Sequence, residues 1–166
     1  HLDGKTVESV DVMVRKIRAA LAARTSSDLF LVARTDARSP LGLDEAIRRA
    51  QIYAELGVDA VFVDAPHSVD ELRRIGAEVS GRLVANISES GLTPTLPAQE
   101  LKQLGFDIVL YPTGALRSAA AIVQEYFAHL HEKGDTSGWV GPMLTLEDFN
   151  SLVGLQDYQR QEAELL

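Results

Sequence analysis

Four short apolar runs in this 166-residue sequence each change abruptly to polar residues at the same end, and three of these stretches carry side chains that could donate hydrogen bonds to an anion. A guanidinium can hold a carboxylate or a phosphate through two parallel hydrogen bonds, and amide and hydroxyl groups can donate to a second anionic group. These residue types therefore indicate a site for a small anionic molecule. The four polar stretches are Arg34-Thr35-Asp36, Asp64-Ala65-Pro66, Asn86-Ile87-Ser88-Glu89-Ser90 and Tyr111-Pro112-Thr113.

Arg34 and Asp64 are the residues in these stretches best suited to chemistry. We expect Arg34 to contact the substrate, and the alternative is a structural ion pair with Asp36, Asp64 or Glu89. Asp64 could orient Arg34, act as a base, or lie behind the ligands of a metal ion; the simplest alternative is that it caps its own loop.

The remaining candidates are neutral. We expect Asn86 and Ser88 to donate hydrogen bonds to an anionic group, although both could serve only the backbone of their turn. Thr113 could line the same site or only cap the helix that comes after it. His129 and His131 are two apart on a predicted helix and point in different directions, so we expect no metal pair there.

A parallel α/β sheet would bring these stretches to one edge. The apolar runs do not alternate with polar residues, which predicts strands buried on both faces. Helical spacing of apolar residues lies between them, and strands that alternate with helices imply βαβ units whose ligands bind at the carboxyl ends of the strands. The predicted strands are 29–33, 60–63, 83–85 and 108–110, and the predicted helices are 10–21, 43–53, 69–79, 97–105 and 115–131.

A polar, glycine-rich stretch and a helical tail come after the last predicted βα unit. Thr145 and Asp148 resemble a capping box at the start of the tail, which an interruption near Gly154 divides. The tail carries apolar residues and needs a surface to pack on. We weigh packing on its own subunit against exchange with a second subunit, and we favour exchange.

Composition excludes several classes of protein. Apolar residues make up 46% and charged residues 24%, as in an ordinary globular domain. The formal net charge is −8, which argues against a nucleic-acid binder, and no apolar run approaches the ~18 residues of a membrane span. The chain has no cysteine, no dinucleotide or phosphate-loop glycine motif and no cluster with metal-ligand spacing.

The ordered set of motifs resembles the isocitrate lyase/phosphoenolpyruvate mutase superfamily, nearest its 2-methylisocitrate lyase-like and carboxyphosphonoenolpyruvate phosphonomutase-like branch. The opening residues 1–5 resemble the end of the K-[KR]-C-G-H loop of the family and the segment after it, with His1 as the last residue of that loop. The motifs that carry the resemblance are 33–37 (ARTDA), 42–50 (GLDEAIRRA), 85–89 (ANISE) with Thr93-Pro94, and 110–112 (LYP).

The resemblance implies a (β/α)8 barrel of which this chain is the second half, strands five to eight, followed by a domain-swapped C-terminal helix. Four βα units agree with this, because a whole barrel takes roughly 250 residues. The implied domains are the half-barrel at 1–133, a linker at 134–144 and the helical tail at 145–166. The implied partners are the N-terminal half of the same barrel and further copies, as a tetramer of two helix-swapped dimers.

The implied activity is Mg²⁺-dependent cleavage of a carbon–carbon bond in a 2-hydroxy di- or tricarboxylate through an enolate, in the cytoplasm. Arg34, His1 and Asp64 would be catalytic, and Asn86, Ser88, Pro112 and Thr113 would bind substrate beside Arg34. The resemblance places the Mg²⁺ ligands and the protonating cysteine outside this chain. The alternatives are oxaloacetate hydrolysis or decarboxylation, a phosphonomutase, a non-catalytic barrel relative, or an unrelated flavodoxin-like domain.

Overall fold

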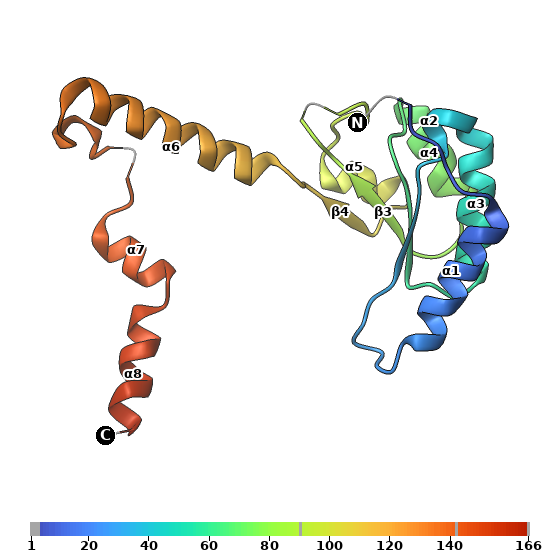
Figure 1. Ribbon diagram of the computed structural model, residues 1–166, viewed down its shortest axis with the longest axis horizontal. Coiled ribbons are helices and arrows are strands. Elements are labelled where there is room, and N and C mark those ends of the chain that lie inside the picture. Colours follow the sequence, from blue (N-terminus) through green and yellow to red (C-terminus); the bar gives the residue numbers. More distant parts are fainter. Residues whose placement is uncertain (1–3, 90, 142, 166) are drawn as a thin grey trace. The chain divides into compact units, whose positions relative to one another are not determined.

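The computed structural model describes residues 4–89, 91–141 and 143–165, and the chain divides after Ala115 into two compact units. The first unit holds a sheet with the order β1-β2-β3-β4, in which every neighbouring pair is parallel (Figure 1). This confirms the predicted parallel α/β fold. The strands are β1 (Val32–Thr35), β2 (Ala60–Val63), β3 (Leu83–Asn86) and β4 (Ile108–Leu110).

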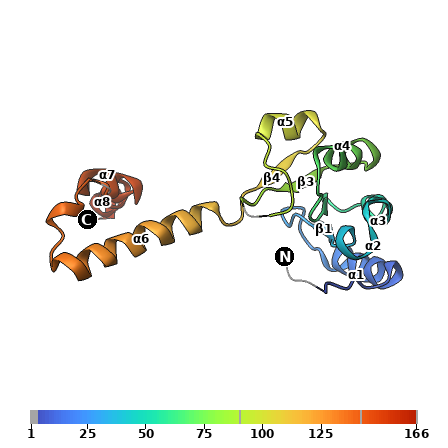
Figure 2. The ribbon, with the colours of Figure 1, turned by 90° about the horizontal axis from the view of Figure 1, so that it is seen from above.

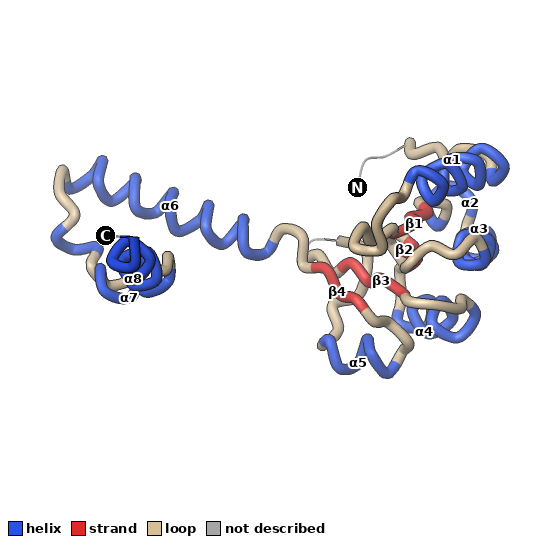
Figure 3. The backbone as a smooth tube through the Cα atoms, turned by 90° about the horizontal axis from the view of Figure 1, so that it is seen from below, coloured by secondary structure: helices blue, strands red, loops and turns tan. Residues whose placement is uncertain are grey.

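Helices pack against one face of this sheet, and they form an outer arc around the strands (Figure 2, Figure 3). Local signals set their ends: Ser9 accepts a hydrogen bond from the Val12 amide, Ser68 accepts one from the Glu71 amide, and Gly57 takes a φ of +86° after the third helix. The helices of this unit are α1 (Val10–Ala23), α2 (Arg38–Leu41), α3 (Leu43–Glu55), α4 (Val69–Glu78) and α5 (Ala98–Gln103). The short helix α2 lies in a segment for which the sequence predicted no helix.

The sheet has two different faces. On the helical face, strand residues such as Val61 and Leu83 join the main core with Tyr53 and Leu72. On the opposite face, Ala60, Phe62 and Val84 form a smaller cluster, and the partly buried Ile108 packs against it. Successive side chains along a strand point to opposite faces. A side chain two positions along the strand from a member of this smaller cluster therefore lies on the same face as the cluster.

The position of the first strand was predicted wrongly. The apolar run at 29–33 predicted a strand there, whereas β1 begins at Val32 and includes Arg34. Leu29 and Phe30 precede the ladder and are 55% and 45% exposed, because pairing with β2 starts only at Val32, opposite Ala60. The prediction that all strands are buried on both faces is right for β2 but wrong for β1, which alternates between exposed and buried, and for β4, which is partly exposed.

The second unit consists of most of α6 (Gly114–Lys133), a 3₁₀ turn η1 (Ser137–Trp139), α7 (Leu146–Leu152) and α8 (Leu155–Leu165). The Thr145 hydroxyl accepts a hydrogen bond from the Asp148 amide, and Gly154 separates the last two helices with a φ of +72°. The first feature confirms the Thr145 cap of the predicted capping box, in which the Asp148 carboxylate accepts a hydrogen bond from the Thr145 hydroxyl, and the second confirms the interruption. None of the described side chains in α6, α7 and α8 is buried. Within the described residues, every helix is too short or too polar to cross a membrane.

Candidate active site

The ends of three strands bring Arg34, Asp64 and Asn86 to the same face of the sheet. Arg34 is in register with Phe62, and Phe62 is in register with Val84. Asp64 comes two residues after Phe62 and Asn86 two after Val84, so all three side chains project from the face that carries the smaller apolar cluster. The Asp64 amide donates to the Thr35 carbonyl at 3.0 Å, which extends the ladder to the position of this carboxylate.

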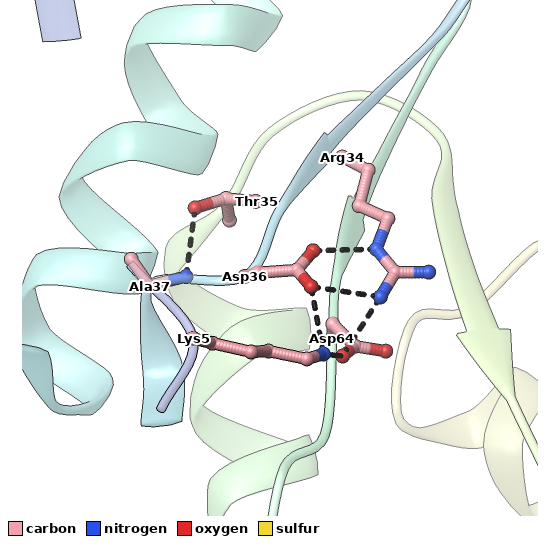
Figure 4. A network of polar contacts seen from close by, with 6 residues as sticks. All are labelled: Lys5, Arg34, Thr35, Asp36, Ala37 and Asp64. Atoms are coloured by element: carbon pink, nitrogen blue, oxygen red, sulfur yellow. Dashed lines mark hydrogen bonds and ion pairs between the residues drawn. The ribbon is translucent and has the colours of Figure 1, made fainter. Parts of the chain in front are cut away.

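Arg34 is held by two carboxylates (Figure 4). Its Nε donates to Asp36 Oδ1 at 2.5 Å, and its Nη2 donates to Asp36 Oδ2 at 2.9 Å. The same Nη2 lies 2.9 Å from Asp64 Oδ2. The alternative of an ion pair with Asp36 and Asp64 is therefore present in the structure, and Asp64 orients Arg34. The third guanidinium nitrogen points away from both carboxylates (Figure 4), and the Arg34 side chain is 46% exposed.

A second cation completes this group. Lys5 Nζ donates to Asp36 Oδ2 at 2.8 Å and to Asp64 Oδ2 at 3.1 Å. We refer to Lys5, Arg34, Asp36 and Asp64 as the charge network; its two positive and two negative charges cancel. The Asp64 side chain is 5% exposed and the Arg34 side chain 46%, so the carboxylate is covered while the guanidinium reaches the surface.

Contacts within the network favour the charged forms of Asp36 and Lys5. The hydrogen bond from Arg34, and after it the one from Lys5, lowers the pKa of Asp36 against the opposing effect of burial. The hydrogen bonds to Asp36 and then to Asp64 raise the pKa of Lys5. The paired contacts with Asp36 and Asp64 fix the Arg34 guanidinium before any ligand arrives.

The backbone beside Asp64 is strained. Ala65 has a φ of +55°, which is uncommon for a residue with a Cβ, and it is 3% exposed. Such a conformation costs on the order of 1–3 kcal/mol and persists only where the surroundings impose it. The turn directs the chain away from β2 immediately after Asp64 is placed.

The other predicted site residues lie at or after the carboxyl ends of β3 and β4. Asn86 ends β3 and is partly buried, and Ser88 comes two residues later with similar exposure. Pro112 is exposed, and Thr113 is partly buried directly before α6. His1, which was predicted to be catalytic, lies outside the described residues.

Sequence reasoning missed two contributors to this site. Lys5 is 31 residues from Asp36 and 59 from Asp64, and no spacing rule connects such positions. Phe62 was assigned only to a strand, yet Arg34 Cζ lies 5.0 Å from the centre of its ring. Alternation along β1 and β2 could have identified Phe62 once the register was known.

The described residues do not fit a complete magnesium site. They contain no group of three His, Cys, Asp or Glu side chains that could hold a metal ion. The two carboxylates of the charge network, Asp36 and Asp64, already form ion pairs with Lys5 and Arg34. Mg²⁺ prefers octahedral oxygen coordination with several waters, which this paired arrangement does not offer.

The space beside the network is small. A cavity of about 160 Å³ lies against Arg34 and Asp36 and is bounded by Met13 and Tyr53 on the helical side. Ligand sites usually measure about 300–1,000 Å³. This cavity is therefore not by itself a pocket for a di- or tricarboxylate.

Known proteins resemble this chain over nearly its whole length. The chain is 41% identical to the petal death protein of Dianthus caryophyllus over 164 residues, which are 99% of this chain and 52% of that protein. It is 36% identical to the 2,3-dimethylmalate lyase of Eubacterium barkeri, over 98% of this chain and 56% of that enzyme. The chain thus spans about half the length of the curated relatives it matches.

Solved structures give the same result. Oxaloacetate acetylhydrolase in complex with 3,3-difluorooxalacetate superposes with a TM-score of 0.89 at 31% identity, over 99% of this chain and 56% of that one. A phosphonopyruvate hydrolase in complex with oxalate and Mg²⁺ superposes with a TM-score of 0.79 at 27% identity, over 98% of this chain and 59% of that one. The phosphoenolpyruvate phosphomutase family matches residues 2–131. From its motifs, its parallel sheet and these matches, the chain belongs to the phosphoenolpyruvate mutase/isocitrate lyase superfamily.

Proposed function

We propose that this chain supplies the substrate-binding half of an Mg²⁺-dependent lyase that cleaves a carbon–carbon bond in a 2-hydroxy di- or tricarboxylate. The observation that carries the proposal is the guanidinium of Arg34, which is fixed by Asp36 and Asp64 at a strand end and faces the same side of the sheet as Asn86. Similarity to a 2,3-dimethylmalate lyase supports this class of reaction.

In the reaction, a base takes the proton of the substrate hydroxyl and the adjacent carbon–carbon bond breaks. The hydroxyl carbon becomes a carbonyl, and the electron pair of the broken bond forms an enolate stabilised by a carboxylate. An acid then protonates the enolate carbon. Arg34 binds the carboxylate on which negative charge develops, and Asp64 keeps the guanidinium in place, so little reorganisation is needed as charge builds up.

The remaining residues fit the second end of such a substrate. Asn86 and Ser88 donate hydrogen bonds to its other carboxylate, and Pro112 and Thr113 line the site beside them. His1, which lies outside the described residues, keeps the catalytic role that the family resemblance implies. The base, the protonating acid and the Mg²⁺ ligands come from outside the described residues, and the Mg²⁺ in the phosphonopyruvate hydrolase complex supports the choice of metal.

The chain works as part of a larger assembly. In our proposal residues 1–133 form the C-terminal half of a (β/α)8 barrel, with β1 to β4 as its strands five to eight. The N-terminal half of the barrel pairs with the open edges of this sheet. The linker 134–144 leads to the tail 145–166, whose exposed apolar side chains pack on another subunit. Two such swapped dimers form a tetramer in the cytoplasm.

A second candidate is hydrolysis of the carbon–carbon bond of oxaloacetate. The 31% identity to oxaloacetate acetylhydrolase over 99% of this chain favours it. Hydrolysis of oxaloacetate and the proposed lyase reaction both act on a carboxylate substrate, so the same Arg34 guanidinium could serve either. Phosphonate rearrangement is the third chemistry represented among relatives.

A substrate panel separates these reactions. The whole protein that contains this chain is incubated with Mg²⁺ and, separately, with 2-methylisocitrate, isocitrate, 2,3-dimethylmalate, oxaloacetate and phosphonopyruvate, and the products are followed by NMR. We expect cleavage of a 2-hydroxy di- or tricarboxylate that stops when EDTA removes the metal. Turnover of oxaloacetate alone would favour the second candidate, and turnover of no substrate would contradict both.

A further inference from the structure

Lys5 occupies a position that the proposed reaction does not yet explain. Its ammonium group bridges Asp36 and Asp64, at 2.8 and 3.1 Å, although it comes from the stretch before α1. The side chain is 24% exposed, so it is partly removed from water. Two charge-assisted hydrogen bonds to carboxylates on different strand ends make this more than an ordinary surface contact.

The fold fixes the stretch that carries Lys5. Arg49 is 6% exposed on α3, where Glu45 accepts a hydrogen bond from its Nε at 2.8 Å. Its Nη1 donates to the Glu8 carbonyl at 2.7 Å, three residues beyond Lys5. The backbone near Lys5 is therefore tied to α3, while the side chain is tied to the ends of β1 and β2.

Charge counting shows what the ammonium group adds. Arg34 contacts two carboxylates, so these three residues alone carry a net charge of −1. That charge would oppose a carboxylate approaching the guanidinium, because like charges a few ångströms apart repel each other. With Lys5 included, the net charge of the charge network is zero.

We propose that Lys5 is a positioning residue that cancels the second carboxylate of the charge network, so that Arg34 can attract an anionic substrate while both aspartates hold it in place. This inference rests on the proposed function, since it assumes an anionic ligand at Arg34. Lys5 acts through Asp36 and Asp64 and does not itself contact the substrate.

Four forms of the whole protein test this role: wild type, Lys5→Met, Asp64→Asn and the double variant. Methionine keeps most of the unbranched stem of lysine and removes its charge. The probe is oxalate with Mg²⁺, measured by calorimetry, and the stability of each form is measured by urea unfolding. Lys16→Met is the matched control, because Lys16 is 61% exposed and lies 3.8 Å from Glu8.

We expect Lys5→Met to raise the Kd for oxalate by about tenfold and Lys16→Met to change it by less than about twofold. Adding Asp64→Asn restores neutrality while Arg34 keeps its paired bonds to Asp36, so the double variant should bind within about threefold of wild type. The unfolding free energies of the two single variants should also be non-additive, because their charges are in direct contact.

Oxalate binding by Lys5→Met equal to that of wild type would overturn the role of Lys5, as would a double variant that binds no better than Lys5→Met. Either result leaves the proposed function intact as long as wild type binds oxalate and turns over a substrate. A wild type that does neither contradicts the proposed function itself, and the anion-binding role of Lys5 is then lost with it.

Discussion

The guanidinium of Arg34 lies over the ring of Phe62, with Cζ 5.0 Å from the ring centre. The two residues are direct neighbours in the β1–β2 register, and Phe62 is 6% exposed. The ring supports one side of the guanidinium while Asp36 and Asp64 fix its edge. Arg34 is thus positioned by a strand neighbour as well as by its ion pairs.

Replacing Phe62 with leucine should loosen Arg34 without opening the core. The cation–π contact is worth about 0.5–1 kcal/mol at a partly exposed site, and an aliphatic replacement of similar size usually costs less than about 1.5 kcal/mol. We expect a loss of about 1–2 kcal/mol in unfolding free energy and a fall of roughly 3–10-fold in kcat/KM. Urea unfolding and steady-state kinetics measure both. Unchanged kinetics would show that the ring does not position Arg34.

Acid should weaken the fold partly through Glu45. Hydrogen bonds from Arg48 and then from Arg49 lower the pKa of Glu45 to about 2, against 4.5 for the free side chain. Because the folded pKa is the lower one, the stabilisation is present above about pH 4.5 and is lost as the pH falls toward 2.

Unfolding measured across this pH window should therefore show a slope that Glu45→Gln reduces. Glu164→Gln is the matched control, since Glu164 lies in the exposed last helix. Equal slopes in wild type and Glu45→Gln would contradict the assignment.

Asn86 should bind substrate as a neutral donor. Asn86→Asp keeps the size of the side chain and replaces its amide with a carboxylate, which repels an anionic substrate. We expect kcat/KM to fall by roughly 100-fold, mainly through KM, with little change in thermal stability because Asn86 is only partly buried. Asn150→Asp in α7 serves as the control. A kcat/KM for Asn86→Asp near that of wild type would remove Asn86 from the site.

Local signals predicted much of the fold, whereas contacts across long stretches of chain could not be predicted. Ser9 and Gly57 mark helix ends through their own hydrogen bonding and φ, and the uninterrupted run 60–63 became the fully buried β2. The run 29–33 gave a wrong strand position because an apolar residue joins a sheet only where a neighbouring strand pairs with it. Leu29 precedes the pairing of β1 with β2 and is exposed.

The candidate site likewise contains residues that the sequence predicted and residues, such as Lys5, that it did not. Arg34, Asp64 and Asn86 were found because parallel strands bring their carboxyl ends together, a rule that needs only the order of elements. The contribution of Lys5 depends on how the stretch before α1 crosses the strand ends.

Removing the residues after Gly141 should disrupt assembly. Leu152 and Tyr158 are 73% and 74% exposed in the structure, and such apolar surface on terminal helices is typical of a subunit interface. We expect a smaller assembly by size-exclusion chromatography with light scattering. Arg160→Gln is the control, because it changes only an exposed ion pair with Asp157. An unchanged mass for the truncated protein would contradict the exchange of this tail.

The most direct test of the account is Arg34→Lys in the whole protein, measured as kcat/KM with Mg²⁺ on the best substrate of the panel. Lysine keeps the charge but loses the planar fork that Asp36 and Asp64 hold, so we expect a fall of roughly 100-fold or more. Arg73→Lys is the control, since Arg73 is 59% exposed and pairs with Asp70 on the surface. A kcat/KM for Arg34→Lys within about twofold of wild type would contradict the claim that this guanidinium binds the reacting carboxylate.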